Sequence, residues 1–139
     1  MTLEEAERFL AVANTGQDAV RDHALFRLFL QTGCRIDELL SLRLNSSFDF
    51  DNEKVRIIGK GDKERILKLS EKTYQALQLY LTERNPWSAQ EQAVFLNLRG
   101  KAISAAEIRK QFKMICEKAE LDKPGLTVHK LRHTCLTHR

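Results

Sequence analysis

Residues 48–69 read FDFDNEKVRIIGKGDKERILKL, and this stretch decides the fold class. Apolar and polar residues alternate over 48–50, 55–58 and 65–69, which is the period of a half-buried strand. The turn formers Asp51-Asn52 and Gly59–Lys63 lie between these runs. The stretch therefore predicts a three-stranded antiparallel meander with tight turns.

Helical periodicity flanks this meander on both sides. Thr2 to Glu5 form a capping box that opens a predicted helix over 3–14, and Ser104 to Glu107 form another that opens a helix to about residue 120. The remaining predicted elements are a central core helix over 18–31, a short helix over 35–42, a helix over 71–84, an extended segment at 94–96 and a last helix capped by Thr127. The whole chain, 1–139, is thus predicted to be one α+β domain, mainly helical with a small three-stranded antiparallel sheet.

Composition and charge narrow the class of protein. The 139 residues carry a net charge of +4, but the first 50 residues are acidic and residues 101–139 hold nine basic and four acidic side chains. A basic end favours a polyanionic partner. The sequence has no secretory signal pattern and no long apolar run, so we expect a cytoplasmic protein without a membrane partner. Three cysteines without a CxxC pair indicate reduced, buried thiols.

The first candidate motif is Thr32-Gly33-Cys34-Arg35-Ile36-Asp37-Glu38-Leu39. It places Arg35 on the first turn of a helix after a glycine break, with Glu38 three residues later on the same helical face. A carboxylate beside an arginine can orient the guanidinium for a phosphate. Taken alone, the motif also fits an ordinary surface ion pair.

The second motif is the turn in which Gly59 and Gly61 flank Lys60. Glycine lets the backbone approach a partner closely. The two glycines therefore allow the Lys60 ammonium group to project from the tip of a hairpin. A solvated hairpin explains the same pattern.

The third motif is His129-Lys130-Leu131-Arg132-His133-Thr134. His129, Arg132 and His133 share one face at the start of the last predicted helix, where an anion is favoured. A metal bound by both histidines is disfavoured because an arginine lies between them and no further ligand follows at helical spacing. Partly buried structural histidines are the other alternative. Together, the three motifs indicate phosphoryl transfer without a metal or other cofactor.

These motifs resemble those of the tyrosine recombinases, also called the phage integrase family. Gly33 to Leu39 is similar to the first arginine box, GxRxxEL, Ile58 to Arg65 to the β-hairpin lysine segment, and His129 to Thr134 to the HxLRHT box. The resemblance implies a double-stranded DNA partner, with Arg35 and Arg132 clamping the scissile phosphate. It also implies that Lys60 protonates the departing 5′ oxygen, that His129 assists proton transfer and that Glu38 is a structural buttress.

The sequence departs from the family pattern in two respects. The next His or Trp motif and the attacking tyrosine would lie beyond Arg139, since Tyr74 and Tyr80 precede the His129 box. We also expect the family's N-terminal core-binding domain to be absent from these 139 residues. We therefore expect a partial catalytic domain that is inactive and monomeric by itself, from a recombinase or integrase that acts as a tetramer on DNA. The alternatives are a non-catalytic DNA-binding module and, more distantly, a basic protein-interaction domain.

Overall fold

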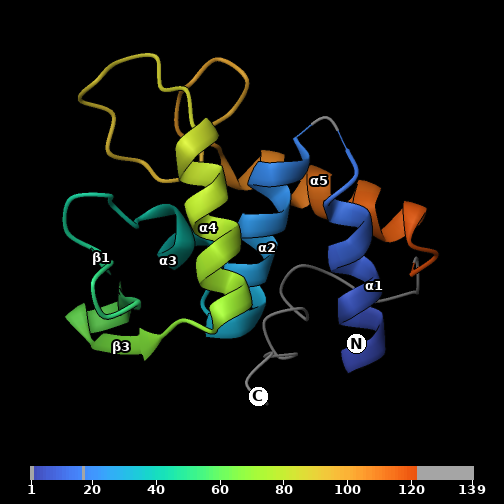
Figure 1. The fold of residues 1–139 in the computed structure, drawn as a ribbon, viewed down its shortest axis with the longest axis horizontal. Helices are drawn as coiled ribbons and strands as arrows, with labels where there is room; N and C mark the ends of the chain where they lie inside the picture. Colours follow the sequence, from blue (N-terminus) through green and yellow to red (C-terminus); the bar gives the residue numbers. More distant parts are fainter. Residues whose placement is uncertain (1, 17, 122–139) are drawn as a thin grey trace.

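The computed structural model describes residues 2–16 and 18–121 as a helical body with a small sheet at one side (Figure 1). The helices are α1 (Leu3–Ala13), α2 (Ala19–Thr32), α3 (Ile36–Leu40), α4 (Glu71–Glu83) and α5 (Ala105–Lys118). The strands are β1 (Phe48–Asp49), β2 (Lys54–Ile58) and β3 (Glu64–Lys68), with a short 3-10 turn η1 (Lys60–Asp62) before β3. The predicted fold class is confirmed, while the helix predicted after Thr127 lies outside the described residues.

Helix α2 is the centre of the core because it is covered on most of its sides. It packs against α1 and α4, and the aromatic rings of Phe9, Phe26 and Phe112 join α1, α2 and α5. The Phe9 ring centroid lies 5.1 Å from that of Phe26, edge-on, and 5.4 Å from that of Phe112. This aromatic cluster connects the start of the chain to its last described helix.

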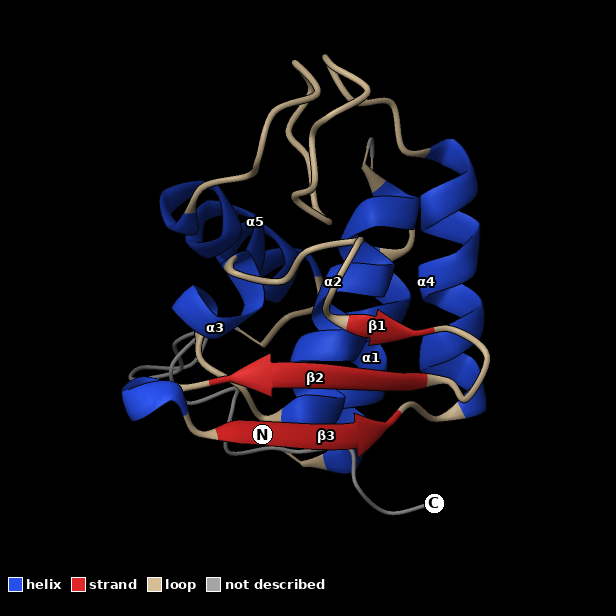
Figure 2. Cartoon of the chain, turned by 90° about the vertical axis from the view of Figure 1, so that its left-hand side faces the viewer, coloured by secondary structure: helices blue, strands red, loops and turns tan. Residues whose placement is uncertain are grey.

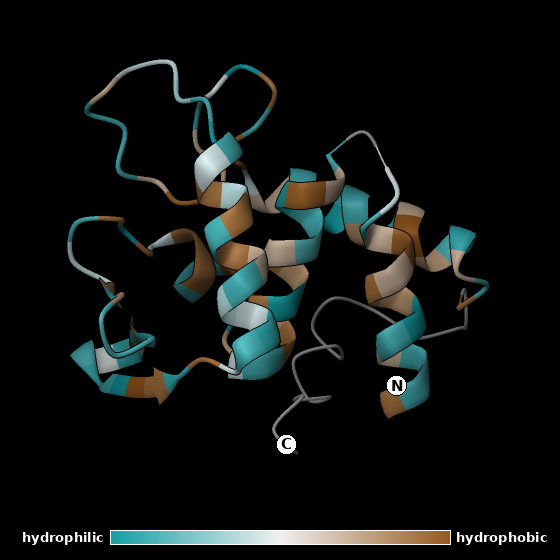
Figure 3. Ribbon diagram, in the orientation of Figure 1, coloured by the Kyte–Doolittle hydropathy of each residue, from teal (hydrophilic) through white to brown (hydrophobic). Residues whose placement is uncertain are grey.

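Helix α4 covers α2 with one apolar face. Hydrophobic and hydrophilic residues alternate around it (Figure 3), as expected for an amphipathic helix. Ala76, Leu77 and Tyr80 are buried, whereas Leu79 is exposed. Ser70 caps the helix by accepting a hydrogen bond from the backbone N–H of Thr73.

The strands are ordered β1-β2-β3 and all pairs are antiparallel (Figure 2). Val55 and Ile57 of β2 are buried, while Arg56 between them is only partly covered, which is the alternation expected from the sequence. In the register of β2 and β3, Ile57 is opposite Arg65 and Val55 is opposite Leu67. Arg65 therefore belongs to the side of the sheet that faces the core.

The extended segment predicted at 94–96 is part of a long loop rather than a strand. Leu96 makes an isolated antiparallel bridge with Ala102, and Ala93 makes another with Arg43. Within the described ranges, no helix is both long and apolar enough to cross a membrane.

Candidate functional site

The backbone around Gly33 sets the position of Arg35. Gly33 ends α2 in a left-handed conformation with φ 65°, which suits a residue without a side chain. The Thr32 hydroxyl donates to the Leu28 carbonyl oxygen at 2.9 Å and accepts from the Cys34 backbone N–H at 3.3 Å. The chain therefore leaves α2 in a fixed direction, and Arg35 becomes the N-cap of α3.

The Arg35 side chain projects toward solvent. It is 57% exposed, and its Nε lies 3.4 Å from the Oδ1 of Asp37, which is itself 79% exposed. Such an exposed pair contributes little to stability because water and salt screen it. A more highly charged ligand with good geometry, such as a phosphate, can therefore compete with Asp37 for the guanidinium.

The Glu38 carboxylate binds the Arg35 backbone and the side chain of Arg65, not the Arg35 guanidinium. The Glu38 Oε1 accepts a hydrogen bond from the Arg35 backbone N–H at 2.8 Å and another from the Arg65 guanidinium at 3.2 Å. Its side chain is only 10% exposed. The expectation that Glu38 orients the Arg35 guanidinium is thus replaced by a different contact, which ties the start of α3 to β3.

The hairpin that carries Lys60 packs against the Glu38 carboxylate. A Cβ atom added at Gly59 would lie 2.6 Å from the Glu38 Oε2, so only glycine fits here without displacing that oxygen. The Gly59 N–H donates to the Lys63 carbonyl oxygen at 2.8 Å and closes the turn, and Gly61 adopts φ 73° within it. Lys60 follows Gly59 directly and is exposed.

The structure thus brings two of the four predicted site residues into one neighbourhood, since α3 and the hairpin meet at Glu38 (Figure 2). Arg35 and Lys60 both expose their cations there. The other two, His129 and Arg132, lie outside the described residues.

Arg65 is the residue that the sequence interpretation missed. Its position in β3 is in phase with Leu67, on the core-facing side of the sheet. Its side chain is still 43% exposed, whereas that of Glu38 is only 10% exposed, so Glu38 is the charge that needs a partner because burying an unpaired charge is costly. The alternation over 65–69 puts Arg65 on the core-facing side of its strand. Glu38, on the preceding helix, is the carboxylate that pairs with it.

The thiol between α2 and Arg35 is not a nucleophile at neutral pH. Cys34 is fully buried, and this burial raises the pKa of its thiol to about 11. The protonated thiol acts as a small apolar core side chain. Among residues 2–16 and 18–121, no three His, Cys, Asp or Glu side chains gather as candidate metal ligands.

The two tyrosines of the chain are both committed to packing on α4. Tyr80 is 5% exposed, its hydroxyl accepts the Leu96 backbone N–H at 2.9 Å, and burial raises its pKa. Tyr74 is partly buried and donates to the Phe50 carbonyl oxygen at 3.3 Å. Neither hydroxyl projects beside Arg35 or Lys60 as a free group.

Comparison with known proteins identifies the family of this chain. Residues 1–138 match the phage integrase family. The chain belongs to this family. Its relatives include the tyrosine recombinase XerC of Corynebacterium glutamicum, 34% identical over 92% of this chain, and that of Actinobacillus pleuropneumoniae, 40% identical over 86% of it.

The solved structures show the same relationship. The XerH site-specific recombinase, bound to its difH substrate in a pre-cleavage complex, superimposes on this integrase-family chain with a TM-score of 0.82 and 29% identity. The match covers 96% of this chain and 41% of XerH. The chain likewise spans 41% and 38% of the lengths of the two XerC relatives.

We predict that Gly59→Ala lowers the free energy of unfolding by about 1–3 kcal/mol, because the new Cβ displaces the Glu38 carboxylate. Gly59 has φ −99°, which alanine also adopts, so the effect reports the contact rather than backbone strain. Urea unfolding measures the change. Gly16→Ala is the control, since a Cβ there meets nothing within 4 Å, and it should change stability by less than about 0.5 kcal/mol.

A double-mutant cycle sharpens this test. In a Glu38→Ala background the obstructing oxygen is absent, so Gly59→Ala should cost much less than in the wild type. Strictly additive effects of the two substitutions would contradict the proposed contact.

We also predict that Cys34 resists alkylation near neutral pH. With its pKa at about 11, only about one thousandth of the Cys34 thiol is ionised at pH 8, against roughly a quarter of an ordinary thiol. Burial also keeps the reagent from the sulfur, so the alkylation rate of Cys34 at pH 8 should be far below that of an exposed thiol. Pulses of iodoacetamide followed by peptide mass mapping measure it, with a peptide of residues 30–38 as the unfolded control. Equal rates in protein and peptide at pH 8 would refute the prediction.

Proposed function

We propose that this chain is a partial catalytic domain of a DNA-cleaving tyrosine recombinase and that it supplies the pocket for the scissile phosphate. The observation that carries the proposal is the Glu38 carboxylate, which ties the helix of Arg35 to the hairpin of Lys60. The backbone segments that carry the two cations are thereby held in one neighbourhood. A fixed arrangement of cations is what a phosphoryl-transfer site requires.

In this proposal, each cation has a separate task. Arg35, together with Arg132, binds the non-bridging oxygens of the scissile phosphate and offsets the charge that grows during attack. A tyrosine oxygen attacks phosphorus, the bond to the 5′ oxygen breaks, and a 3′-phosphotyrosine forms. Lys60 gives a proton to the departing 5′ oxygen, while His129 assists the transfer of the tyrosine proton. No cofactor takes part in these steps.

The attacking tyrosine is neither Tyr74 nor Tyr80. Both hydroxyls are engaged in packing on α4, and Tyr80 is buried. The 139-residue chain is therefore proposed to be inactive and monomeric by itself. The nucleophile, and assembly into a tetramer on DNA, belong to the recombinase or integrase of which this domain is part.

The proposed partner is double-stranded DNA, and α5 supports it. Arg109, Lys110 and Lys113 are exposed on this helix, and a capping box at Ser104 fixes its start. Basic side chains on one helix bind phosphates by releasing counterions, so the affinity should fall as salt rises. The relative XerH, bound to its difH substrate, is consistent with such a partner.

We predict that Arg35→Ala and Lys60→Ala each weaken duplex binding and reduce the slope of log affinity against log salt by about 1, as expected for the loss of one phosphate contact. Fluorescence anisotropy of a labelled duplex over a series of salt concentrations measures both quantities. Lys63→Ala is the matched control, because it removes the same charge from the same hairpin three residues away. An equal effect of Lys63→Ala would indicate general charge attraction and favour the non-catalytic binding module.

We further predict that the 139-residue chain forms no covalent adduct with nicked duplexes, either of randomised sequence or carrying difH. XerH on difH is the positive control, since its post-cleavage complex is known. Denaturing gels of end-labelled DNA would reveal an adduct. An adduct that peptide mapping assigns to Tyr74 or Tyr80 would overturn the proposed role of α4.

A further inference from the structure

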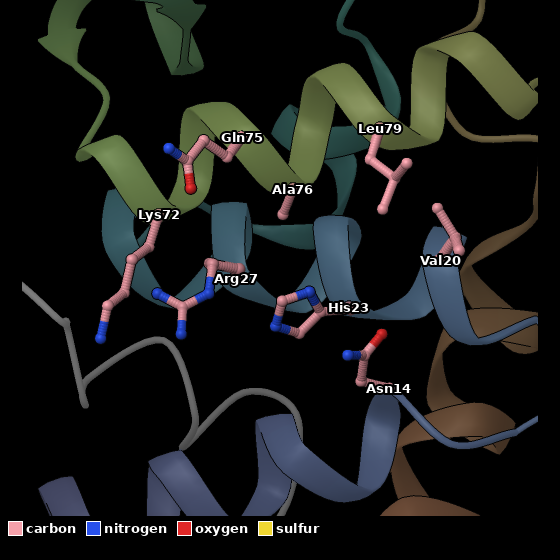
Figure 4. Close-up of a pocket in the computed structure, with 8 residues that line it drawn as sticks. All are labelled: Asn14, Val20, His23, Arg27, Lys72, Gln75, Ala76 and Leu79. Carbon is pink, nitrogen blue, oxygen red and sulfur yellow. The ribbon is translucent and has the colours of Figure 1, made fainter.

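A separate cavity of about 280 Å³ lies between the end of α1, α2 and α4. Figure 4 shows its lining, in which Val20, His23 and Arg27 form one stripe along α2 and Lys72 reaches in from α4. These α2 residues are spaced three and four apart, so they share the one side of α2 that the core does not fully cover. The cavity uses no residue of the Arg35–Lys60 neighbourhood.

The charges in this cavity are unbalanced. The Arg27 Nε is buried without a hydrogen-bond partner, although buried nitrogens of this kind are nearly always paired. Within the described ranges, no carboxylate lies within 4 Å of the charged groups of Arg27 or Lys72. The Glu7 carboxylate on α1 acts on Arg27 only through its field. A ligand with several oxygen acceptors would satisfy these donors.

We propose that this cavity binds a dianionic oxyanion, namely a phosphate or sulfate group. The two permanent positive charges of Arg27 and Lys72 match a dianion better than a single carboxylate. The side-chain amide of Asn14 adds donors at the rim, whereas the Gln75 amide already donates to the Glu71 carboxylate at 3.2 Å. Val20 and Leu79 offer apolar surface to the organic part of a phosphate ester. The inference does not depend on the DNA-binding proposal.

His23 makes the site sensitive to pH. Burial and, to a smaller extent, the Arg27 charge lower the pKa of His23, so the imidazole is neutral at pH 7 in the free protein. A bound dianion favours the protonated imidazole, and by linkage the protonated form binds the dianion more tightly. Arg27 and Lys72, the two cations that line the cavity with His23, oppose this proton. Affinity should therefore rise as pH falls through the His23 pKa.

Sulfate is the probe for the first experiment, because it stays dianionic from pH 5 to pH 8. NMR of the His23 ring and of the Arg27 Nε–H follows titration with sodium sulfate at constant ionic strength. We expect saturable shifts, protection of the Arg27 Nε–H from solvent exchange, and tighter binding at pH 5.5 than at pH 8. Arg27→Gln and Lys72→Gln should each weaken binding by about tenfold or more, which is the loss of one charged hydrogen bond.

Arg99→Gln is the matched control, since Arg99 lies on an exposed loop outside the cavity and should leave the sulfate titration unchanged. Linear shifts that are the same in wild type and Arg27→Gln would overturn the proposal. Acetate binding as tightly as sulfate would overturn the assignment of a dianion.

Competition then identifies the source of the phosphate. Displacement of sulfate by inorganic phosphate but not by a duplex assigns a free phosphate compound, whereas displacement by the duplex assigns a nucleic-acid phosphate. If Arg35→Ala weakens DNA binding while the sulfate titration stays intact, the two sites are independent. If the His23 signals do not respond to sulfate while DNA binding is normal, the oxyanion proposal is refuted and the DNA-binding proposal is not.

Discussion

The arrangement of the site depends on one carboxylate. Glu38 accepts hydrogen bonds from the Arg35 backbone and the Arg65 guanidinium and lies against the bare Cα of Gly59. Since it is mostly shielded from water, its interactions are stronger than those of a surface ion pair. A helix start, an edge strand and a turn are therefore fixed relative to one another by a single side chain. The Arg35 and Lys60 side chains project from this frame.

Polar side chains also fix the ends of other elements in the fold. The Arg84 guanidinium binds the backbone carbonyls of Glu91, Ala93 and Val94 and thereby holds the long loop after α4. Gln31 of α2 donates to the Lys68 carbonyl oxygen and accepts from the Ser70 backbone N–H, so it joins the end of the sheet to the start of α4. Polar side chains at the ends of elements thus set the geometry, while the aromatic cluster supplies cohesion.

Much of this could be predicted from the sequence because local signals were strong. The capping boxes at Thr2 and Ser104 marked the starts of helices, and the alternation over 48–69 gave the sheet and its turns. The arginine and lysine motifs correctly indicated the family. The role of Glu38 was only half visible, because the spacing in a helix shows which residues share a face but not which strand packs there. Residues 94–96 form isolated bridges rather than a strand, since apolar character alone does not distinguish a buried loop from a strand.

The aromatic cluster also has a consequence for how the chain folds during synthesis. Phe9 packs against Phe112. The Arg8 guanidinium donates to the Ala119 carbonyl oxygen, and these two residues are 111 positions apart in the sequence. The ribosome releases α1 long before α5 exists, so α2 alone can cover part of the apolar side of α1 while most of this sequence is translated. Contacts of such separation also slow folding, because a large loop must close first. Nascent chains that end before α5 are thus the form of this protein that most needs a chaperone.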